Sequence, residues 1–195
     1  MFVFGIDESI PVPLFRACSI PSKVNVVDDA GNVVDTYSNA AKNIERPGKT
    51  FVSTEAVSIS GSRAIDYGQS YEAAVRGLYG DVPFGQCQYE ALVNGKLVNG
   101  VADNVVQIGR KNTAIEAKYV DDWATSLRNP TSQNGTKPWA LAEQQRMLDQ
   151  AIKYNSAFDQ VIYHTNSADI ATHYGNVFRN AGVTNFEFVI TPVIK

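Results

Sequence analysis

Three charged side chains interrupt apolar, strand-like segments near the middle of the 195-residue chain. Asp103 stands in the stretch "GVADNVVQI", and Glu116 and Lys118 stand in the stretch "AIEAKYV". Because alternate residues of a β-strand share one face, Glu116 and Lys118 project from the same side of their strand. The separation of 13 residues between Asp103 and Glu116 fits two adjacent strands joined by a short turn. We therefore expect the two carboxylates to lie side by side.

Two neighbouring carboxylates are a poor structural contact, since like charges on adjacent strands repel. The pair becomes favourable when a cation lies between the two side chains. Mg²⁺ prefers oxygen ligands and commonly uses one or two carboxylates, with water and phosphate oxygens in the remaining positions. A lysine on the same face can orient and help to deprotonate an attacking water and offset charge on a phosphate. The three residues predict metal-assisted hydrolysis; a solvated strand face of ordinary Asp, Glu and Lys is the alternative interpretation.

The elements around these residues indicate a mixed α/β fold. Hydrophobic periodicity and helix-end signals predict helices near residues 70–80, 139–155 and 167–182. Alternating and apolar runs predict strands near residues 86–93, 96–108, 113–120, 158–165 and 186–193. Asn94-Gly95 is typical of a tight hairpin turn between the first two strands. The predicted order from residue 66 onward is α-β-β-β-α-β-α-β.

The first 60 residues differ from the rest, with four prolines and no group of side chains that could carry out chemistry. A hairpin over residues 23–38 and a strand within residues 50–60 are expected there. We therefore predict an accessory N-terminal region over residues 1–60 and a functional domain over residues 61–195.

Composition narrows the class of protein. Hydrophobic residues make up 44% of the chain, which is enough for a packed core, and no apolar run is long enough to span a bilayer. Cys18 and Cys87 are too few for a disulfide scaffold and lack the grouping of a zinc site, so two free, buried thiols are expected, with one disulfide as the alternative. The net charge of −3 is not typical of a nucleic-acid-binding protein. Residues 104–153 are more basic, with seven Lys and Arg against five acidic residues.

The acidic residues, the lysine and the element order together resemble the PD-(D/E)xK restriction-endonuclease superfamily. More narrowly, "DNVVQIG", "AIEAKYVDDW" and "AEQQRMLDQA" resemble the restriction-endonuclease-fold toxin domains of bacterial polymorphic toxins. The resemblance covers roughly residues 61–195. It implies an α-β-β-β-α-β core with a mixed sheet flanked by helices. Ala102 stands where the superfamily's name-giving proline would precede the aspartate.

The resemblance also implies roles for individual residues. Asp103 and Glu116 would be ligands of Mg²⁺ or Mn²⁺, Ala117 would contribute a backbone carbonyl, and Lys118 would be the catalytic lysine. An additional acid on the first helix falls at Glu72.

The helix near residues 139–155 is expected to reach the same site. Its predicted apolar stripe runs through Leu141, Leu148 and Ile152, with Gln144 and Gln145 on its flanks. In related nucleases a glutamine of this helix reaches the active site, and Gln144 is the preferred candidate.

At the level of biology, the resemblance implies a nuclease toxin that is delivered into competitor bacteria and acts in their cytoplasm. DNA is the preferred substrate, tRNA is the alternative, and a cognate immunity protein is the expected partner. A non-catalytic binding module and a housekeeping or phage nuclease remain as other readings. The two histidines, His164 and His173, are interpreted as core or capping residues, and Trp123 and Trp139 as core residues.

Overall fold

A six-stranded mixed sheet forms the centre of the computed structural model, which describes residues 42–46, 49–79 and 87–195. The strand order is β1-β2-β9-β8-β7-β6. Strands β2, β9, β8 and β7 run parallel, and β1 and β6 are antiparallel at the two edges. The bounds are β1 Lys42–Arg46, β2 Lys49–Ser53, β6 Asn104–Ile108, β7 Lys111–Lys118, β8 Gln160–Thr165 and β9 Phe186–Ile190.

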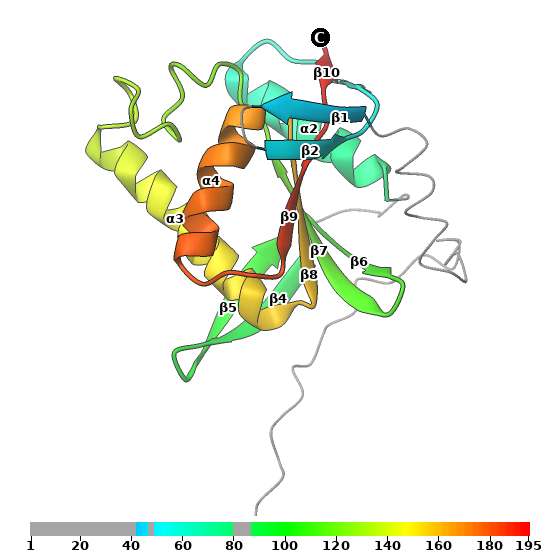
Figure 1. The fold of residues 1–195 in the computed structure, drawn as a ribbon, viewed down its shortest axis with the longest axis vertical. Coiled ribbons are helices and arrows are strands. Elements are labelled where there is room, and N and C mark those ends of the chain that lie inside the picture. The colour runs from blue at the N-terminus through cyan, green and yellow to red at the C-terminus, as the bar shows by residue number, and fades with distance from the viewer. Residues whose placement is uncertain (1–41, 47–48, 80–86) are drawn as a thin grey trace, which may run out of the picture.

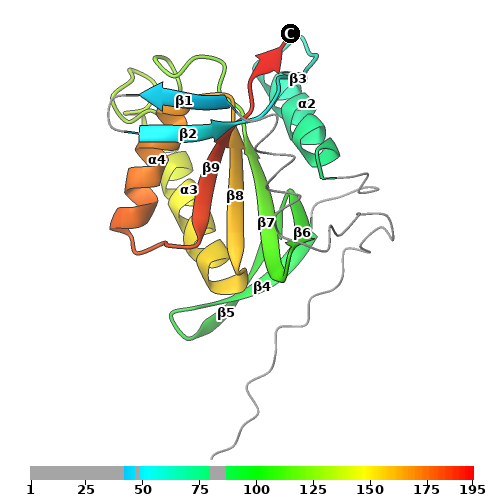
Figure 2. The ribbon, with the colours of Figure 1, turned by 45° about the vertical axis from the view of Figure 1, so that its right-hand side comes forward.

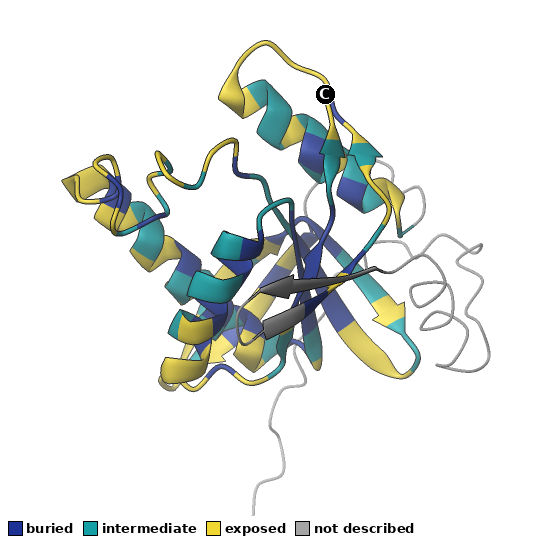
Figure 3. Ribbon diagram, turned by 45° about the horizontal axis from the view of Figure 1, so that its top comes forward, coloured by how far each residue is buried: buried dark blue, intermediate teal, exposed yellow. Residues whose placement is uncertain are grey.

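Three helices cover the two faces of this sheet (Figures 1 and 2). Helix α2, Ala64–Gly77, packs on one face beside β7. Helices α3, Pro138–Ala157, and α4, Ala168–Asn180, cover the other face. The alternation along β8 follows from this sandwich, because Val161 and Tyr163 join the cluster beneath α3 and α4 while Ile162 joins the cluster beneath α2. Figure 3 shows the buried residues concentrated where helices and sheet meet.

A separate two-stranded hairpin leads into the central sheet. It consists of β4, Cys87–Val93, and β5, Lys96–Ala102, joined at Asn94 and Gly95, which both have positive φ as a tight hairpin turn requires. The hairpin packs against α3, and β5 continues almost directly into β6. The single return strand expected over residues 96–108 is therefore two strands that meet at Asp103. A short parallel pair, β3 Val57–Ser58 with β10 Val193–Ile194, lies at the C-terminal end.

The structure confirms the mixed α/β class with helices on both sides of a mixed sheet. The first helix begins at Ala64 rather than near Ser70, because Asp66 accepts the backbone N–H of Arg63 and closes a capping box there. The hairpin expected over residues 23–38 lies outside the described residues. Cys87 is disulfide-bonded, so the expectation of two free thiols is wrong. No helix in the described ranges is long and apolar enough to cross a membrane.

Two of the described strands of residues 42–60 pair with strands near the C-terminal end of the chain, in the central sheet and in the short β3–β10 sheet. Strand β2 pairs with β9, and β3 pairs with β10. Phe51 and Ile59 are buried in the two hydrophobic clusters. The domain boundary between residues 60 and 61 stays a prediction, although strands on both sides of it share backbone hydrogen bonds.

Candidate active site

Asp103 occupies the junction between the hairpin and the central sheet. Strand β5 ends its pairing with β4 at Ala102, and β6 begins its pairing with β7 at Asn104. The aspartate is therefore outside both ladders, and its side chain is only 8% exposed. Its Oδ2 accepts a hydrogen bond of 2.8 Å from the backbone N–H of Ala117. This bond fixes the carboxylate against β7, next to Glu116.

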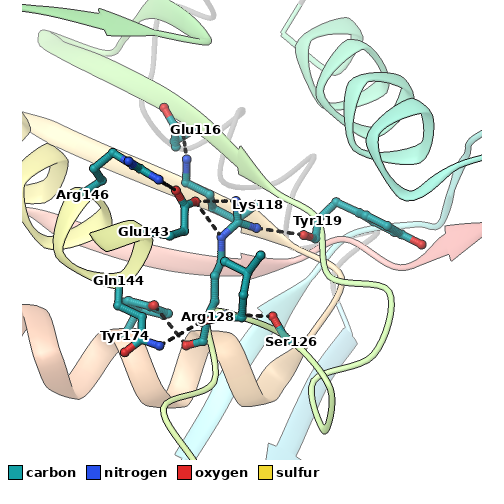
Figure 4. A network of polar contacts seen from close by, with 10 residues as sticks. Glu116, Lys118, Tyr119, Ser126, Arg128, Glu143, Gln144, Arg146 and Tyr174 are labelled. Carbon is teal, nitrogen blue, oxygen red and sulfur yellow. Dashed lines mark hydrogen bonds and ion pairs between the residues drawn. The ribbon is translucent and has the colours of Figure 1, made fainter. Parts of the chain in front are cut away.

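Glu116 is almost fully buried beneath α3, at 2% exposure. Its Oε1 accepts a hydrogen bond from Lys118 Nζ, and its Oε2 accepts one from the hydroxyl of Tyr154 on α3. Figure 4 shows the lysine ammonium directed at the Glu116 carboxylate. A buried carboxylate requires such partners, because desolvation of an unpaired charge costs several kcal/mol. The predicted side-by-side arrangement of Asp103, Glu116 and Lys118 on β6–β7 is thus present in the structure.

The electrostatics of Asp103 reflect a crowded acidic site. Burial, followed by the nearby Glu116 carboxylate, raises the pKa of Asp103 to about 7. The Lys118 ammonium and the Ala117 N–H act in the opposite direction. The effects of Lys118 and Ala117 are therefore smaller than the combined effects of burial and Glu116 on the pKa of Asp103.

Glu72 lies on α2, against the face of the sheet opposite to α3. Its carboxylate pairs with Arg76 at 3.7 Å. Burial raises the pKa of Glu72, Arg76 lowers it, and Glu116 raises it further. Glu72 in turn raises the pKa of Asp103. Glu72 is therefore close enough to interact electrostatically with Asp103 and Glu116, but it makes no hydrogen bond to either carboxylate.

The donor set fits a hard divalent cation. In the described part of the chain no group of three or more His, Cys, Asp and Glu side chains is gathered for a metal. A site of two carboxylates and a carbonyl does not need three such side chains. The pairing of β7 with β6 ends at Ile115. Because the N–H and C=O of one strand residue point to the same side, the carbonyl of Ala117 faces the side of Asp103.

Gln144 lies elsewhere than the sequence interpretation places it. Its Nε2 donates to the carbonyl oxygens of Leu127 at 2.8 Å and Gly135 at 2.9 Å. In Figure 4 it points toward the long loop between β7 and α3, away from Glu116. Gln145 bonds to Asp149 one turn further along the same helix. Neither glutamine bonds to Asp103, Glu116 or Lys118 in the structure as described.

Tyr154 and Gln150 are the residues of α3 that do reach the site. Gln150 Nε2 donates to the Tyr154 hydroxyl at 3.1 Å, and that hydroxyl also lies 3.2 Å from the carbonyl oxygen of Val101. The two side chains are one helical turn apart, so they share a face. That i, i+4 pair, next to the buried Met147 and Ala151, is the sequence signal that could have identified them.

A cavity of about 370 Å³ adjoins Lys118 between α3 and the β4–β5 hairpin. Its wall is mixed in charge, with three cations and two carboxylates. The lining residues are Tyr89, Gly100, Val101, Lys118, Glu143, Arg146, Met147, Asp149, Gln150 and Lys153. The cavity gives a ligand access to the Lys118 end of the carboxylate cluster.

A network of ion pairs anchors the loop that borders this cavity. Arg128 pairs with Glu143 at 3.1 Å and donates to the Tyr119 carbonyl at 3.1 Å. Arg146 pairs with the other oxygen of Glu143 at 2.9 Å. Figure 4 shows Glu143 bracketed by the two guanidinium groups. The residues after β7 are thereby tied to α3.

The remaining candidates have structural surroundings. His164 is fully buried between Tyr79, at 2.6 Å, and Thr191, at 2.7 Å, and burial lowers its pKa to about 3. The expected core role of His164 is therefore confirmed. Trp123 packs against the core and lies beside His173, with ring centroids 5.7 Å apart. Trp139 is 62% exposed, so its assignment to the core is wrong.

No family model, no curated protein and no solved structure matches the chain. The interpretation of the site is therefore based on the types and the geometry of its residues.

Proposed function

We propose that the chain is a metal-dependent nuclease with a restriction-endonuclease-like fold. The observation that carries the proposal is the cluster of Asp103, Glu116 and Lys118 on the adjoining ends of β6 and β7. Two buried carboxylates and one lysine beside an open cavity are a costly arrangement for stability alone. The succession α2, β4, β5, β6, β7, α3 and β8 supports an α-β-β-β-α-β core if β5 and β6, which are separated only by Asp103, count as one interrupted strand.

In this proposal Asp103, Glu116 and the carbonyl of Ala117 hold Mg²⁺ or Mn²⁺. The cation would supply Lewis-acid polarisation of a phosphodiester and lower the pKa of an attacking water. Lys118 takes over two tasks. In the free protein its ammonium neutralises Glu116, and with substrate present it donates to a phosphate oxygen. The N–H of Ala117 and the hydroxyl of Tyr154 keep the two carboxylates oriented. Glu72 adds negative potential to the site from the opposite face.

DNA is the proposed substrate, and tRNA is the alternative on the same chemistry. The resemblance to polymorphic toxin domains supports a toxin that is delivered into competitor bacteria, acts in their cytoplasm and is neutralised by a cognate immunity protein. Of the seven Lys and Arg of residues 104–153, Lys118, Arg146 and Lys153 line the cavity and provide positive charge at the site in an otherwise acidic chain.

The test is incubation of the purified chain with supercoiled plasmid DNA and with total tRNA, in Mg²⁺, in Mn²⁺ and in a chelator. We expect metal-dependent cleavage of the plasmid by the wild-type chain. Glu116→Gln and Asp103→Asn should cut neither substrate while keeping the wild-type circular dichroism spectrum. Arg110→Gln, in the turn that precedes β7, is the matched control and should cut normally. Equal cleavage by wild type and both carboxylate variants would exclude this active site.

A non-catalytic binding module is the second candidate, because a Glu116–Lys118 pair could serve structure alone. Calorimetric titration with Mn²⁺ separates the two functions. A nuclease should bind the cation and lose that binding in Glu116→Gln, whereas a binding module should show no heat in either protein.

A further inference from the structure

One side of α3 carries a row of polar and aromatic side chains that runs past the carboxylate cluster. At 100° per residue, positions separated by three or four residues stay within about 40° of a line along the helix. The row consists of Trp139, Glu143, Arg146, Gln150 and Lys153. All but the tryptophan line the cavity that adjoins Lys118. The row therefore extends the cavity wall toward the beginning of α3.

The two cations of the row have donors to spare. Arg146 is 68% exposed and uses Nε and Nη2 in its pairing with Glu143, which Arg128 also pairs. The ammonium of Lys153 makes one long contact, 3.4 Å, with the carbonyl oxygen of Asn99. Neither cation is consumed by a buried ion pair, so both remain available to an anionic ligand in the cavity.

Trp139 stands at the outer end of the row, where it contributes little to the core. It is 62% exposed, in contrast to Trp123, which packs against the main hydrophobic cluster. An exposed indole is a stacking surface for a nucleobase, and such stacking is independent of the base sequence. Stacking of this kind requires a base that is not enclosed in a duplex.

We infer that this row binds a nucleic-acid strand with unpaired bases and guides it to Lys118. Arg146 and Lys153 hold phosphates of the strand, and Trp139 stacks on a base beyond them. The two cations are seven positions apart, which corresponds to about 10.5 Å along the helix, so their side chains can contact different phosphates of one strand. The inference rests on the proposed nuclease function and specifies the form of its substrate.

The experiment measures binding without cleavage. Fluorescence anisotropy follows a labelled single-stranded DNA oligonucleotide, and a duplex of the same sequence, on the Glu116→Gln protein across a salt series. We expect the single strand to bind more tightly. Trp139→Ala should weaken single-strand binding by about fivefold or more and leave duplex binding unchanged, while Trp139→Phe keeps most of the affinity. Replacement of Arg146 and Lys153 by glutamine should lower the salt slope by about 1.4, as expected for two lost phosphate contacts.

Two controls match these changes in kind. Leu141→Ala removes an exposed apolar side chain from another side of α3. Arg110→Gln with Lys111→Gln removes two cations about 23 Å along β7 from Lys118. Both should bind as the parent does, and melting temperatures verify that each variant is folded.

The possible failures are distinguishable. If the parent binds DNA but the row variants bind equally well, or if duplex is preferred and Trp139→Ala changes nothing, the inference is wrong and the nuclease proposal stands. If the parent binds neither DNA and the wild-type chain cuts no nucleic acid, the proposed function fails and the inference fails with it.

Discussion

The hydroxyl of Tyr154 donates a hydrogen bond to the buried carboxylate of Glu116, and so ties α3 to β7 at the candidate active site. Tyr154 bonds to Oε2 of Glu116, whereas Lys118 bonds to Oε1. Both carboxylate oxygens of Glu116 are therefore held by hydrogen bonds. A carboxylate oriented in this way is a preorganised ligand, and its orientation depends on one phenolic hydroxyl.

Tyr154→Phe should lower nuclease activity by about tenfold or more, because the loss of a residue that orients a metal ligand typically has effects of that size. The free energy of unfolding should fall by about 1–3 kcal/mol, since Glu116 loses a buried hydrogen-bond donor. Plasmid cleavage rates and thermal melts measure the two effects.

Tyr163→Phe is the matched control. Tyr163 is equally buried, it pairs with Glu116 across β7 and β8, and its hydroxyl has no hydrogen-bond partner in the structure as described. Removal of that hydroxyl should leave stability unchanged or raise it slightly. If the two variants behave alike, Tyr154 does not orient Glu116.

The stability of the metal-free protein should depend on Asp103. Its pKa rises from the ordinary 3.8 to about 7 on folding, because of burial and then the charge of Glu116. Between these values the folded protein holds a proton that the unfolded chain has lost. Stability therefore falls as the pH rises through this window, and the full penalty is present above pH 7.

At pH 8 in a chelator, the free energy of unfolding of Asp103→Asn should accordingly exceed that of wild type by up to about 4 kcal/mol. Its melting temperature should be higher as well. The difference should shrink toward pH 4.5, where the carboxyl group is protonated in the folded wild type. Asp149→Asn, an exposed carboxylate of α3, should change stability by less than about 0.5 kcal/mol at either pH. An Asp103→Asn protein that is less stable than wild type at pH 8 would contradict the interpretation that the ionised Asp103 carboxylate destabilises the metal-free fold.

The sequence predicts the cluster well because local rules determine its geometry. Alternation along β7 places Glu116 and Lys118 on one face, and the short turn between β6 and β7 brings Asp103 alongside. The same rules predict the helix–strand order from α2 to β9, except that the one return strand expected over residues 96–108 is the two strands β5 and β6. The break between β5 and β6 at Asp103 is harder to predict from the sequence, because it arises where the β4–β5 hairpin leaves the central sheet and packs on α3.

The buried face of α3 is predicted only in part, since Leu148 and Ile152 of the expected apolar stripe pack against the core but Leu141 does not. Leu141 is 53% exposed, whereas the buried side consists of Ala140, Met147, Ala151 and Tyr154. The small alanines leave room for close packing, and the buried Tyr154 hydroxyl finds a hydrogen-bond acceptor in Glu116. Neither reason can be recognised from hydrophobicity alone. Because the buried face of α3 differs from the predicted one, Gln150 rather than Gln144 lies at the site.

The two glutamines should therefore have separable roles. Gln144→Ala removes two hydrogen bonds to loop carbonyls, so proteolysis of the loop over residues 119–137 should accelerate while cleavage activity is largely kept. Gln150→Ala loosens Tyr154 and should lower activity without opening the loop. Timed proteolysis and plasmid cleavage on the same samples provide the comparison. An inactive Gln144→Ala protein with a protected loop would restore Gln144 as a site residue.

Lys118 should compete with the metal for Glu116. Its ammonium occupies Oε1 in the free protein, and it is not itself a metal ligand. Lys118→Ala should therefore bind Mn²⁺ as tightly as wild type or more tightly, yet lose about a hundredfold or more in cleavage rate. Calorimetry and single-turnover cleavage report the two quantities, with Lys111→Ala as a control at the start of β7. A loss of Mn²⁺ affinity as large as that of Glu116→Gln would instead show that Lys118 organises the site.

Expression of the chain in bacteria without a partner protein should arrest growth, because phosphodiester hydrolysis of the genome or of the tRNA pool is lethal. Glu116→Gln should abolish the arrest at equal levels of soluble protein, and Arg110→Gln should preserve it. If DNA is the substrate, arrested cells should lose nucleoid staining while their tRNA stays intact on a denaturing gel. Intact nucleoids with cut tRNA would replace DNA by tRNA and leave the roles of Asp103, Glu116 and Lys118 unchanged. Normal growth with abundant folded wild-type protein would contradict the toxin proposal and favour the binding module.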